Sequence, residues 1–342
     1  METFLITGNN LTNLAEELLK QNWNLVSLSE DKKNYKIINK SDKIFLDSYA
    51  APTKISFKEY FFPKTETLFY YQSNLNGVGL VEPELNNSKT VIFGAKPCDA
   101  ASIPILSKVF NWDYKDDFFN RRVENTVVIG LACKYSDEYC FCNSVGLSQN
   151  SAKGSDIFLT AYDDNSFDVK VMTPKGKDFI EAFKNFFEAK ESTASITEDI
   201  SDANSVGNIN YQRVKKWLDT NFDNEFWNTA GELCLGCAQC AFVCPTCHCF
   251  DIVDENCDLS CGRRAKNWDS CQFGLFTKHA SGHNPRDKQE KRYRQRIMHK
   301  FKYYNDRFGE ILCTGCGRCS RGCPAGINIA GILEDINSVS SR

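Results

Sequence analysis

Two cysteine runs with the same spacing constrain this chain more than any other feature. The first run spans residues 234–245 and the second spans residues 313–324, and both read C-x2-C-x2-C-x3-C-P. This spacing is typical of cubane iron–sulfur cluster sites, in which the fourth cysteine of each run binds the other cluster. We therefore expect two [4Fe-4S] clusters, one bound by Cys234, Cys237, Cys240 and Cys323 and the other by Cys313, Cys316, Cys319 and Cys244.

Zinc is the alternative occupant of these runs, and it would make the chain a zinc-stabilised binding module without a redox role. Structural zinc sites usually take four ligands from two separated pairs of residues. Each run here instead supplies three closely spaced cysteines, which suit a four-iron cube better than a single tetrahedral ion. We favour iron–sulfur clusters for this reason.

Length and charge bound the class of protein. A chain of 342 residues is long enough for two or three domains. Its 41 Lys and Arg against 44 Asp and Glu give a net charge of −3, which gives no reason to expect nucleic acid or a membrane surface as partner. Residues 1–11 lack a basic stretch followed by an apolar one, and no later run is long enough to span a bilayer. We expect a soluble, cytoplasmic protein.

The 17 cysteines are concentrated in the last third of the chain. Only four precede residue 234, and without an export signal we do not expect disulfides. Cys257 and Cys261 are expected to be free thiols. Because oxygen damages exposed thiolates and clusters, the composition favours an anaerobic or reducing setting.

Residues 1–190 have the pattern of an α/β domain. A helix is expected at residues 11–19, with Asn10 as its cap, and another at residues 178–187. The expected strands are short apolar runs at residues 3–7, 23–28, 35–38, 43–46, 90–94 and 126–131, followed by a hairpin formed by residues 156–162 and 167–172.

The four N-terminal cysteines follow two of these strands. Cys98 comes after the strand at residues 90–94 and begins a helix that Asp99 is expected to cap, and the strand at residues 126–131 leads to Cys133. Strand carboxyl ends meet at one sheet edge in such domains. We therefore favour a third cluster bound by Cys98, Cys133, Cys140 and Cys142, the alternative being buried, inert thiols.

The remainder of the chain has a different pattern. Residues 191–210 are polar and are expected to be a linker or mobile loop. A helix is expected at residues 211–226, within a mainly helical two-cluster domain at residues 211–342. The basic stretch at residues 286–302 is interpreted as a solvated helix face, or alternatively as a docking surface for an acidic partner.

A second set of cysteines competes for the third-cluster assignment. Cys247, Cys249 and Cys271 lie between the two runs and lack an obvious fourth ligand. His248, His283 or a partner protein would have to supply it. We rank this set below the N-terminal four.

Nucleotide-binding motifs are missing from the sequence. It contains neither G-x-G-x-x-G after a strand nor G-x4-G-K-[ST]. We therefore expect no flavin or NAD in this chain and no catalytic residues of its own, so that another subunit performs hydride or substrate chemistry. A self-contained thiol or sulfur reductase with Cys98 as nucleophile is a further hypothesis, but neither a base nor a flavin site accompanies Cys98.

Several phrases of the sequence together resemble one family. They lie at residues 61–63, 66–69, 94–99, 138–143, 244–250, 268–271, 282–286 and 315–319. Over nearly its whole length the chain is similar to beta subunits of cytosolic sulfhydrogenases and to the corresponding iron–sulfur subunits of anaerobic sulfite reductases. The resemblance implies an electron-transfer protein that relays electrons between a flavin subunit, which handles NAD(P), and a further redox subunit. The chain departs from the family at Lys96 and Pro285, and Cys257 and Cys261 look like additions to its pattern.

Overall fold

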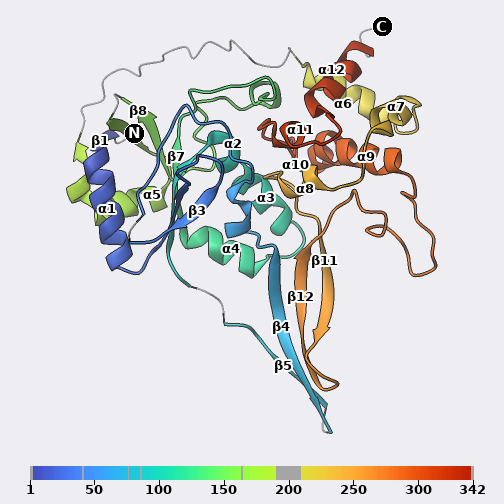
Figure 1. Ribbon diagram of the computed structural model, residues 1–342, viewed down its shortest axis with the longest axis horizontal. Helices are drawn as coiled ribbons and strands as arrows, with labels where there is room; N and C mark the ends of the chain where they lie inside the picture. Colours follow the sequence, from blue (N-terminus) through green and yellow to red (C-terminus); the bar gives the residue numbers. More distant parts are fainter. Residues whose placement is uncertain are drawn as a thin grey trace.

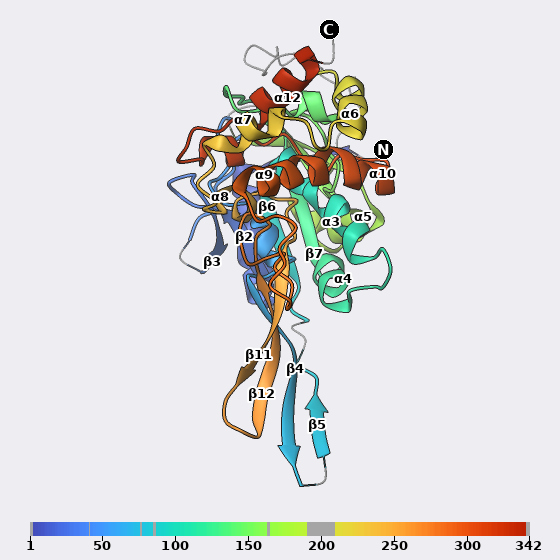
Figure 2. The ribbon, with the colours of Figure 1, turned by 90° about the vertical axis from the view of Figure 1, so that its right-hand side faces the viewer.

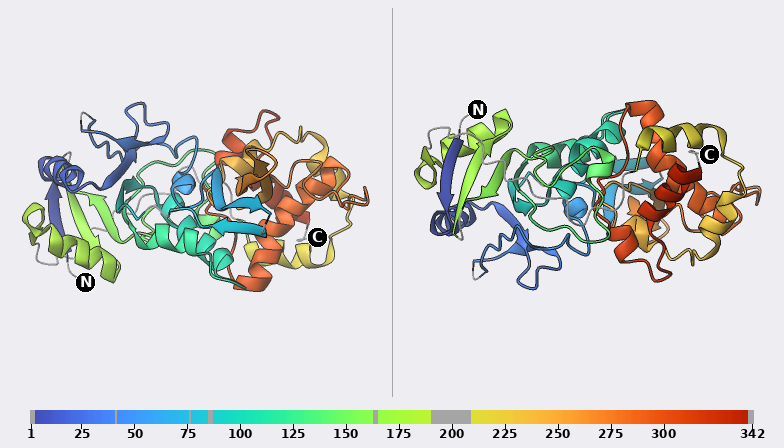
Figure 3. Two further views of the ribbon diagram at one scale, coloured as in Figure 1. Left: turned by 90° about the horizontal axis from the view of Figure 1, so that it is seen from below. Right: turned by 90° about the horizontal axis from the view of Figure 1, so that it is seen from above.

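The structure is a computed structural model that describes residues 3–40, 42–75, 77–84, 87–162, 165–189 and 209–339. A sheet with its helices lies at one end of the molecule and a group of helices at the other, and a long β arm projects between them (Figure 1). The views from below and above show the same two ends (Figure 3). The expected linker lies outside the described residues, apart from 209–210. Within the described ranges, no helix has the length and apolar character needed to cross a membrane.

The N-terminal region is built on an eight-stranded mixed sheet of order β10-β1-β9-β8-β7-β6-β2-β3. Its central strands are parallel: β2 (Asn24–Leu28), β6 (Thr90–Ala95), β7 (Thr126–Leu131) and β8 (Ile157–Ala161). The outer strands pair antiparallel: β1 (Thr3–Thr7), β3 (Tyr35–Ile38), β9 (Ser166–Val171) and β10 (Glu188–Ala189). The expected α/β pattern is confirmed, and the continuous apolar runs of β6 and β7 reflect burial on both faces.

Helices cover both faces of this sheet. On one face lie α1 (Gly8–Lys20) and α5 (Pro174–Ala182), and on the other α3 (Ser102–Phe110) and α4 (Asp117–Glu124). Neighbouring residues of β6 point to opposite faces of the sheet, since Val91 belongs to the same core cluster as Leu14 and Ile92 to the same core cluster as Leu106. Because side chains on both faces of the sheet are buried, their packing fixes the position of the ends of β6 and β7.

Two local expectations in this region are wrong. Helix α1 is capped by Thr7, whose Oγ1 accepts a hydrogen bond from the Asn10 backbone N at 3.2 Å, and not by Asn10. Residues 43–46 form no strand. Their backbone is satisfied by a side chain instead, because Ser27 Oγ bonds both the Phe45 carbonyl (3.1 Å) and the Phe45 N (3.2 Å).

The expected hairpin of residues 156–162 and 167–172 is confirmed as the antiparallel pair β8–β9. The helix expected at residues 178–187 begins earlier, at Pro174, and ends at Ala182. Thr173 explains the early start, because its Oγ1 accepts from the Gly176 N at 3.1 Å and the proline is suited to the first helical turn.

The C-terminal helices share a separate core. Its main members are α6 (Tyr211–Thr220), α7 (Phe226–Glu232), α9 (Gln289–Met298) and α12 (Ile329–Val339). The single helix expected at residues 211–226 is interrupted at residues 221–225, because Asn224 Oδ1 accepts from the Phe226 N and starts a new helix. Four short elements complete the region: α8 (Gln239–Phe242), the π-helical turn His299–Tyr303, α10 (Tyr304–Phe308) and α11 (Arg318–Arg321).

A four-stranded arm of order β11-β12-β4-β5 projects from the body (Figure 2). Its strands are β4 (Thr65–Asn74), β5 (Gly77–Val81), β11 (Phe250–Asn256) and β12 (Cys261–Trp268). The hairpin β11–β12 comes from the insert between the two cysteine runs, so the mainly helical C-terminal part also contains two strands that the sequence did not predict. Because β12 pairs with β4, the arm also joins the two halves of the chain.

The turn between β11 and β12 carries a disulfide between Cys257 and Cys261. The expectations of two free thiols here and of a chain without disulfides are therefore wrong. The antiparallel register explains the pairing, because the turn brings the two residues to a Cα separation of 5.6 Å.

Candidate iron–sulfur sites

The first cavity gathers the three leading cysteines of the first run with the last cysteine of the second. Cys234, Cys237, Cys240 and Cys323 all line it. Cys319 lines it as well, although the spacing rule assigns this residue to the other cluster, so the two sites adjoin. The structure thus brings the four expected ligands together, and their assignment to one cluster stays a prediction.

Both runs fold in the same way. Gly236 and Ala238 have φ values of 67° and 63°, and the equivalent residues Gly315 and Gly317 have values of 65° and 70°. This pair of left-handed residues turns each run back on itself so that its cysteines converge. A side chain at Gly315 would also collide with the Cys142 backbone, since its Cβ would lie 2.5 Å from that residue's N and Cα. The second run therefore lies directly against the loop that carries Cys140 and Cys142.

The other four cysteines of the two runs form the second site. The pKa of the Cys313 thiol is raised to about 12, mainly by burial and also by the neighbouring Cys244 and Cys319 thiols, although the Lys300 ammonium acts to lower it. The Cys316 thiol has a raised pKa for the same reasons, with burial the largest and Cys244 and Cys319 also contributing. Cys244 therefore lies near Cys313 and Cys316, as cross-ligation requires.

The spacing of these sulfur atoms does not suit single zinc ions. With Zn–S bonds of about 2.3 Å, tetrahedral ligands lie about 3.8 Å apart. Among the residues that the structure describes, only Cys257, Asp258 and Cys261 bring three ligand atoms within 4.8 Å of one another. The cysteines of the two runs are spread more widely, which fits a core of several irons.

Two residues of the basic stretch are buried beside the sites. Arg296 and Lys300 expose only 3% and 2% of their surface, so the interpretation as a solvated face is wrong for them. The Lys300 Nζ lies 3.2 Å from the Cys244 Sγ. Arg296 donates to the Cys247 Sγ (3.3 Å) and to the Cys240 carbonyl (2.8 Å). Buried cations of this kind are held by negative partners such as thiolates or a thiolate-bound cluster.

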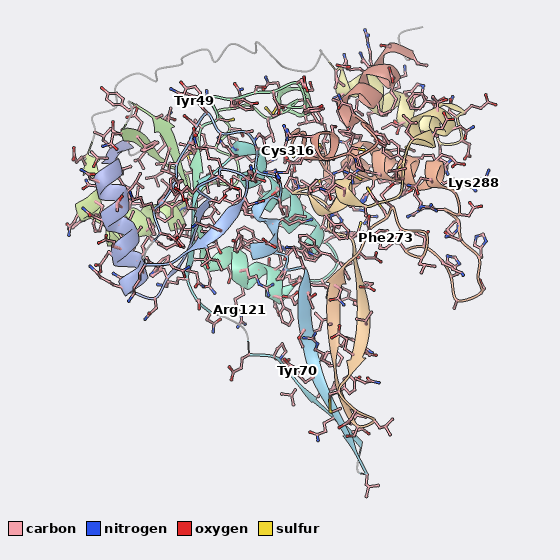
Figure 4. All side chains as sticks on the ribbon, in the orientation of Figure 1. Tyr49, Tyr70, Arg121, Phe273, Lys288 and Cys316 are labelled. Atoms are coloured by element: carbon pink, nitrogen blue, oxygen red, sulfur yellow. A yellow bond between two sulfur atoms is a disulfide. The ribbon has the colours of Figure 1, made fainter. Side chains whose placement is uncertain are left out.

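The four N-terminal cysteines line one cavity at the carboxyl ends of β6 and β7. Cys98, Cys133, Cys140 and Cys142 surround it, and Cys316 of the second run lies in its wall. Figure 4 labels Cys316 in the middle of the body, where the sheet region meets the helical region. The expected convergence of the four cysteines is present, and the cluster itself stays a prediction.

Two arginines of the second run form ion pairs with acidic residues beside this cavity. Arg318 forms a buried ion pair with Asp99, with Nη1–Oδ1 and Nη2–Oδ2 distances of 2.8 and 2.6 Å. Asp99 lies inside the short helix α2 (Pro97–Ala100), whose N-cap is Lys96, so its expected capping role is wrong. Arg321 similarly pairs with Asp137, at 2.6 Å between Nη2 and Oδ2.

Cys98 lacks the properties of an activated nucleophile. Burial raises its pKa well above the usual range for a thiol, and Asp99 raises it further. The Lys96 Nζ donates to the Asp47 and Ser48 carbonyls at 2.8 and 3.3 Å. Reactive cysteines instead have lowered pKa values, so the site gives no support to a self-contained thiol reductase.

A further cavity brings together the second set of cysteines that was considered for the third cluster. Cys247, Cys249 and Cys271 line it with His248 and His299. His283, considered as a ligand from the sequence, instead packs against His279, with ring centroids 5.4 Å apart. Sequence reasoning missed His299. Its position three residues after Arg296 could have indicated that His299 lies at this site, because residues spaced this way share one helix face.

Comparison with known sequences agrees with this geometry. Residues 233–327 match the family described as a 4Fe-4S dicluster domain. Its boundaries enclose all eight cysteines of the two runs, so the C-terminal part of the chain is a domain for two [4Fe-4S] clusters.

A relative of similar length defines the family of the whole chain. Over 311 residues the chain is 31% identical to the sulfhydrogenase 2 subunit beta of Pyrococcus furiosus, and the match covers 87% of each protein. The chain therefore belongs to the sulfhydrogenase beta subunit family of iron–sulfur proteins. No solved structure matches it.

Proposed function

We propose that this chain is the electron-transfer subunit of a soluble, cytoplasmic oxidoreductase complex. It relays single electrons between a subunit that binds flavin and NAD(P) and a terminal redox subunit, which is a hydrogenase, a sulfite reductase or a heterodisulfide-reductase-like protein. The chain itself is non-catalytic and holds neither flavin nor NAD. Its two domains are residues 1–190 and 211–342, and they share the β arm.

Three clusters form the relay in this proposal. Two are cross-ligated by the cysteine runs, one by Cys234, Cys237, Cys240 and Cys323 and the other by Cys313, Cys316, Cys319 and Cys244. The third is bound by Cys98, Cys133, Cys140 and Cys142. The observation that carries the proposal is the position of Cys316, which is a proposed ligand of the second cluster and also lines the N-terminal four-cysteine cavity. The two proposed clusters would therefore be neighbours, as an electron relay requires.

The charge balance of the N-terminal cavity supports a bound cluster. Burial raises the pKa of Cys98 well above the usual range and that of Cys140 to about 12. Four thiolates in this cavity would be costly without a positive centre, and an iron–sulfur core provides one. The nearby arginines are already neutralised by Asp99 and Asp137. The donor set therefore fits a [4Fe-4S] cluster.

Iron and sulfide quantitation on the full-length chain tests the third cluster. The intact chain is needed because Gly315 and Cys316 form part of the cavity wall. After anaerobic reconstitution, Cys133→Ala should contain about four iron fewer per chain than the wild type. Ser148→Ala, which changes a lining residue without a thiol, should keep the full content. A folded Cys133→Ala protein with wild-type iron would show that no cluster is bound there.

A further inference from the structure

We propose that a further iron–sulfur cluster is bound at the base of the β arm by Cys247, Cys249, Cys271 and the His248 imidazole. The three cysteines and the histidine line one cavity, which also contains Arg296 and Lys300. This site is separate from the three clusters proposed above, and its test does not depend on the N-terminal site.

The β arm itself positions the three cysteines. Strands β11 and β12 pair in a register that places Phe250 opposite Trp268 and Asp251 opposite Asn267. The ladder continues one step further, because the Asp269 N donates to the Cys249 carbonyl at 3.0 Å. Just beyond this pair, the Cys271 thiol contacts the Cys249 thiol, and the Cys247 thiol contacts that of Cys244.

His248 has the hydrogen bond expected of a histidine ligand. Its Nδ1 lies 3.0 Å from the Thr246 carbonyl, so Nδ1 carries the proton and Nε2 keeps a free lone pair. Histidines that bind metals typically donate their other ring N–H to a backbone carbonyl or a carboxylate in this way. The His248 ring packs edge-on against His299, with centroids 5.4 Å apart, and this contact fixes the orientation of the imidazole.

The donor set and its surroundings favour a cluster over a single ion. The Cys249 and Cys271 thiols are in hydrogen-bond contact. Within the described part of the chain, however, Cys247, Cys249 and Cys271 do not form a group with all ligand atoms within 4.8 Å. The ligands of one zinc ion would need that spacing. The dicluster cysteines show the same wide spread, which suits several irons.

Three buried cations surround the cavity. Lys58 donates to the Cys247 carbonyl at 2.9 Å, and Arg296 donates to the Cys247 Sγ at 3.3 Å. Lys300 lines the cavity wall and reaches Cys244. A thiolate-bound cluster is net negative, and it becomes more negative by one charge when it accepts an electron. The site therefore favours the reduced state of a bound cluster.

The position of this site gives it a role between the two dicluster sites. Gln272 Nε2 donates to the Cys271 Sγ at 3.4 Å, while Gln272 Oε1 accepts from the Cys234 thiol at 3.7 Å. On the other side, the Lys300 Nζ lies within 3.2 Å of the Cys244 Sγ. A cluster here contacts the surroundings of both dicluster centres, and it would store the electron that the other clusters deliver.

Iron analysis of the full-length, anaerobically reconstituted chain tests the ligand assignment. Cys271→Ala and Cys249→Ala should each lower the iron and sulfide content by about four per chain. Cys261→Ala, a matched change at the arm tip, should leave both contents unchanged. Cys133→Ala reports on the N-terminal site alone, and its loss should add to that of Cys271→Ala. Failure of one proposal is therefore distinguishable from failure of the other.

Pulsed EPR tests the histidine ligand. With 15N-labelled histidine, the reduced wild-type chain should show nitrogen coupling to one cluster. His248→Cys should keep the iron and lose this coupling, whereas His279→Gln, a change at a histidine outside the cavity, should keep both. Wild-type iron content in the folded Cys249→Ala and Cys271→Ala proteins would overturn the proposal. Formation of a disulfide between Cys249 and Cys271 on oxidation, without loss of iron, would also overturn the proposal.

Discussion

Asp99 and Arg318 form a two-pronged ion pair in the centre of the molecule, with side chains 0% and 1% exposed. Asp99 follows Cys98 in the N-terminal region, and Arg318 precedes Cys319 in the second cysteine run. The pair therefore fixes the N-terminal cavity against the dicluster domain. The packing of the folded core therefore sets the distance between these two sites.

Loss of one partner of this pair should destabilise the whole chain. Arg318→Met leaves the Asp99 carboxylate buried without its cation, and such changes cost about 3–5 kcal/mol. Anaerobic denaturant unfolding should show the corresponding drop in the midpoint. The double variant Asp99→Asn/Arg318→Met should recover part of the loss, because no uncompensated charge remains.

Arg264→Met supplies the control for this measurement. Arg264 and Asp254 also form an ion pair, with an Nε–Oδ1 distance of 2.7 Å, but both side chains are exposed on the arm. Solvent screening makes such surface pairs weak, so the midpoint should stay unchanged. Equal effects of Arg264→Met and Arg318→Met would contradict the assigned role of the buried pair.

Cross-ligation predicts which cluster each fourth cysteine supports. Cys244→Ala should damage the cluster of Cys313, Cys316 and Cys319, because its missing ligand comes from the first run. Cys323→Ala should damage the cluster of the Cys234 triplet. EPR spectra of the two reduced variants should therefore lack different signals. The assignment is wrong if Cys244→Ala removes the signal that Cys234→Ala removes.

Lys300 should tune the cluster bound by Cys244. Reduction adds negative charge, and the Lys300 ammonium, 3.2 Å from the Cys244 Sγ, stabilises that charge. Lys300→Met should therefore lower the reduction potential, by roughly 60 mV for a change of about 1.4 kcal/mol. Lys300→Arg retains the cation and should lie near the wild type in an EPR-monitored redox titration. An unchanged or raised potential in Lys300→Met would contradict this account.

The isolated chain should neither retain flavin nor reduce NAD(P). No dinucleotide fingerprint follows any strand of its sequence, so the nicotinamide chemistry is expected to require a second subunit. Flavin released from the denatured, purified chain can be quantified by chromatography and fluorescence. Stoichiometric flavin in the single chain would refute this prediction.

Local patterns predicted much of the sheet and the cysteine geometry. The apolar runs of β6 and β7 identified both strands because strands buried on two faces carry few polar residues. Their carboxyl ends then placed Cys98 and Cys133 at one sheet edge. The repeated spacing of the two runs likewise predicted convergence of their cysteines.

Features that depend on distant partners escaped prediction. Strand β11 is exposed at most positions and has acidic residues within it, so it lacks the usual pattern of a strand. It is held by its register with β12, which in turn pairs with β4. Asp99 looked like a helix cap because its partner, Arg318, lies 219 residues away. Arg296 and Lys300 looked solvated because nothing local reveals the thiols beside them.

We predict that the N-terminal cavity holds a cluster next to the one bound by Cys316. EPR of the fully reduced full-length chain tests it most directly, by comparison of the wild type with Cys133→Ala. We predict that the variant loses about one spin per chain and that the signal of the neighbouring cluster sharpens, because its magnetic partner has gone. Identical spin counts and line shapes in the two proteins would contradict the claim.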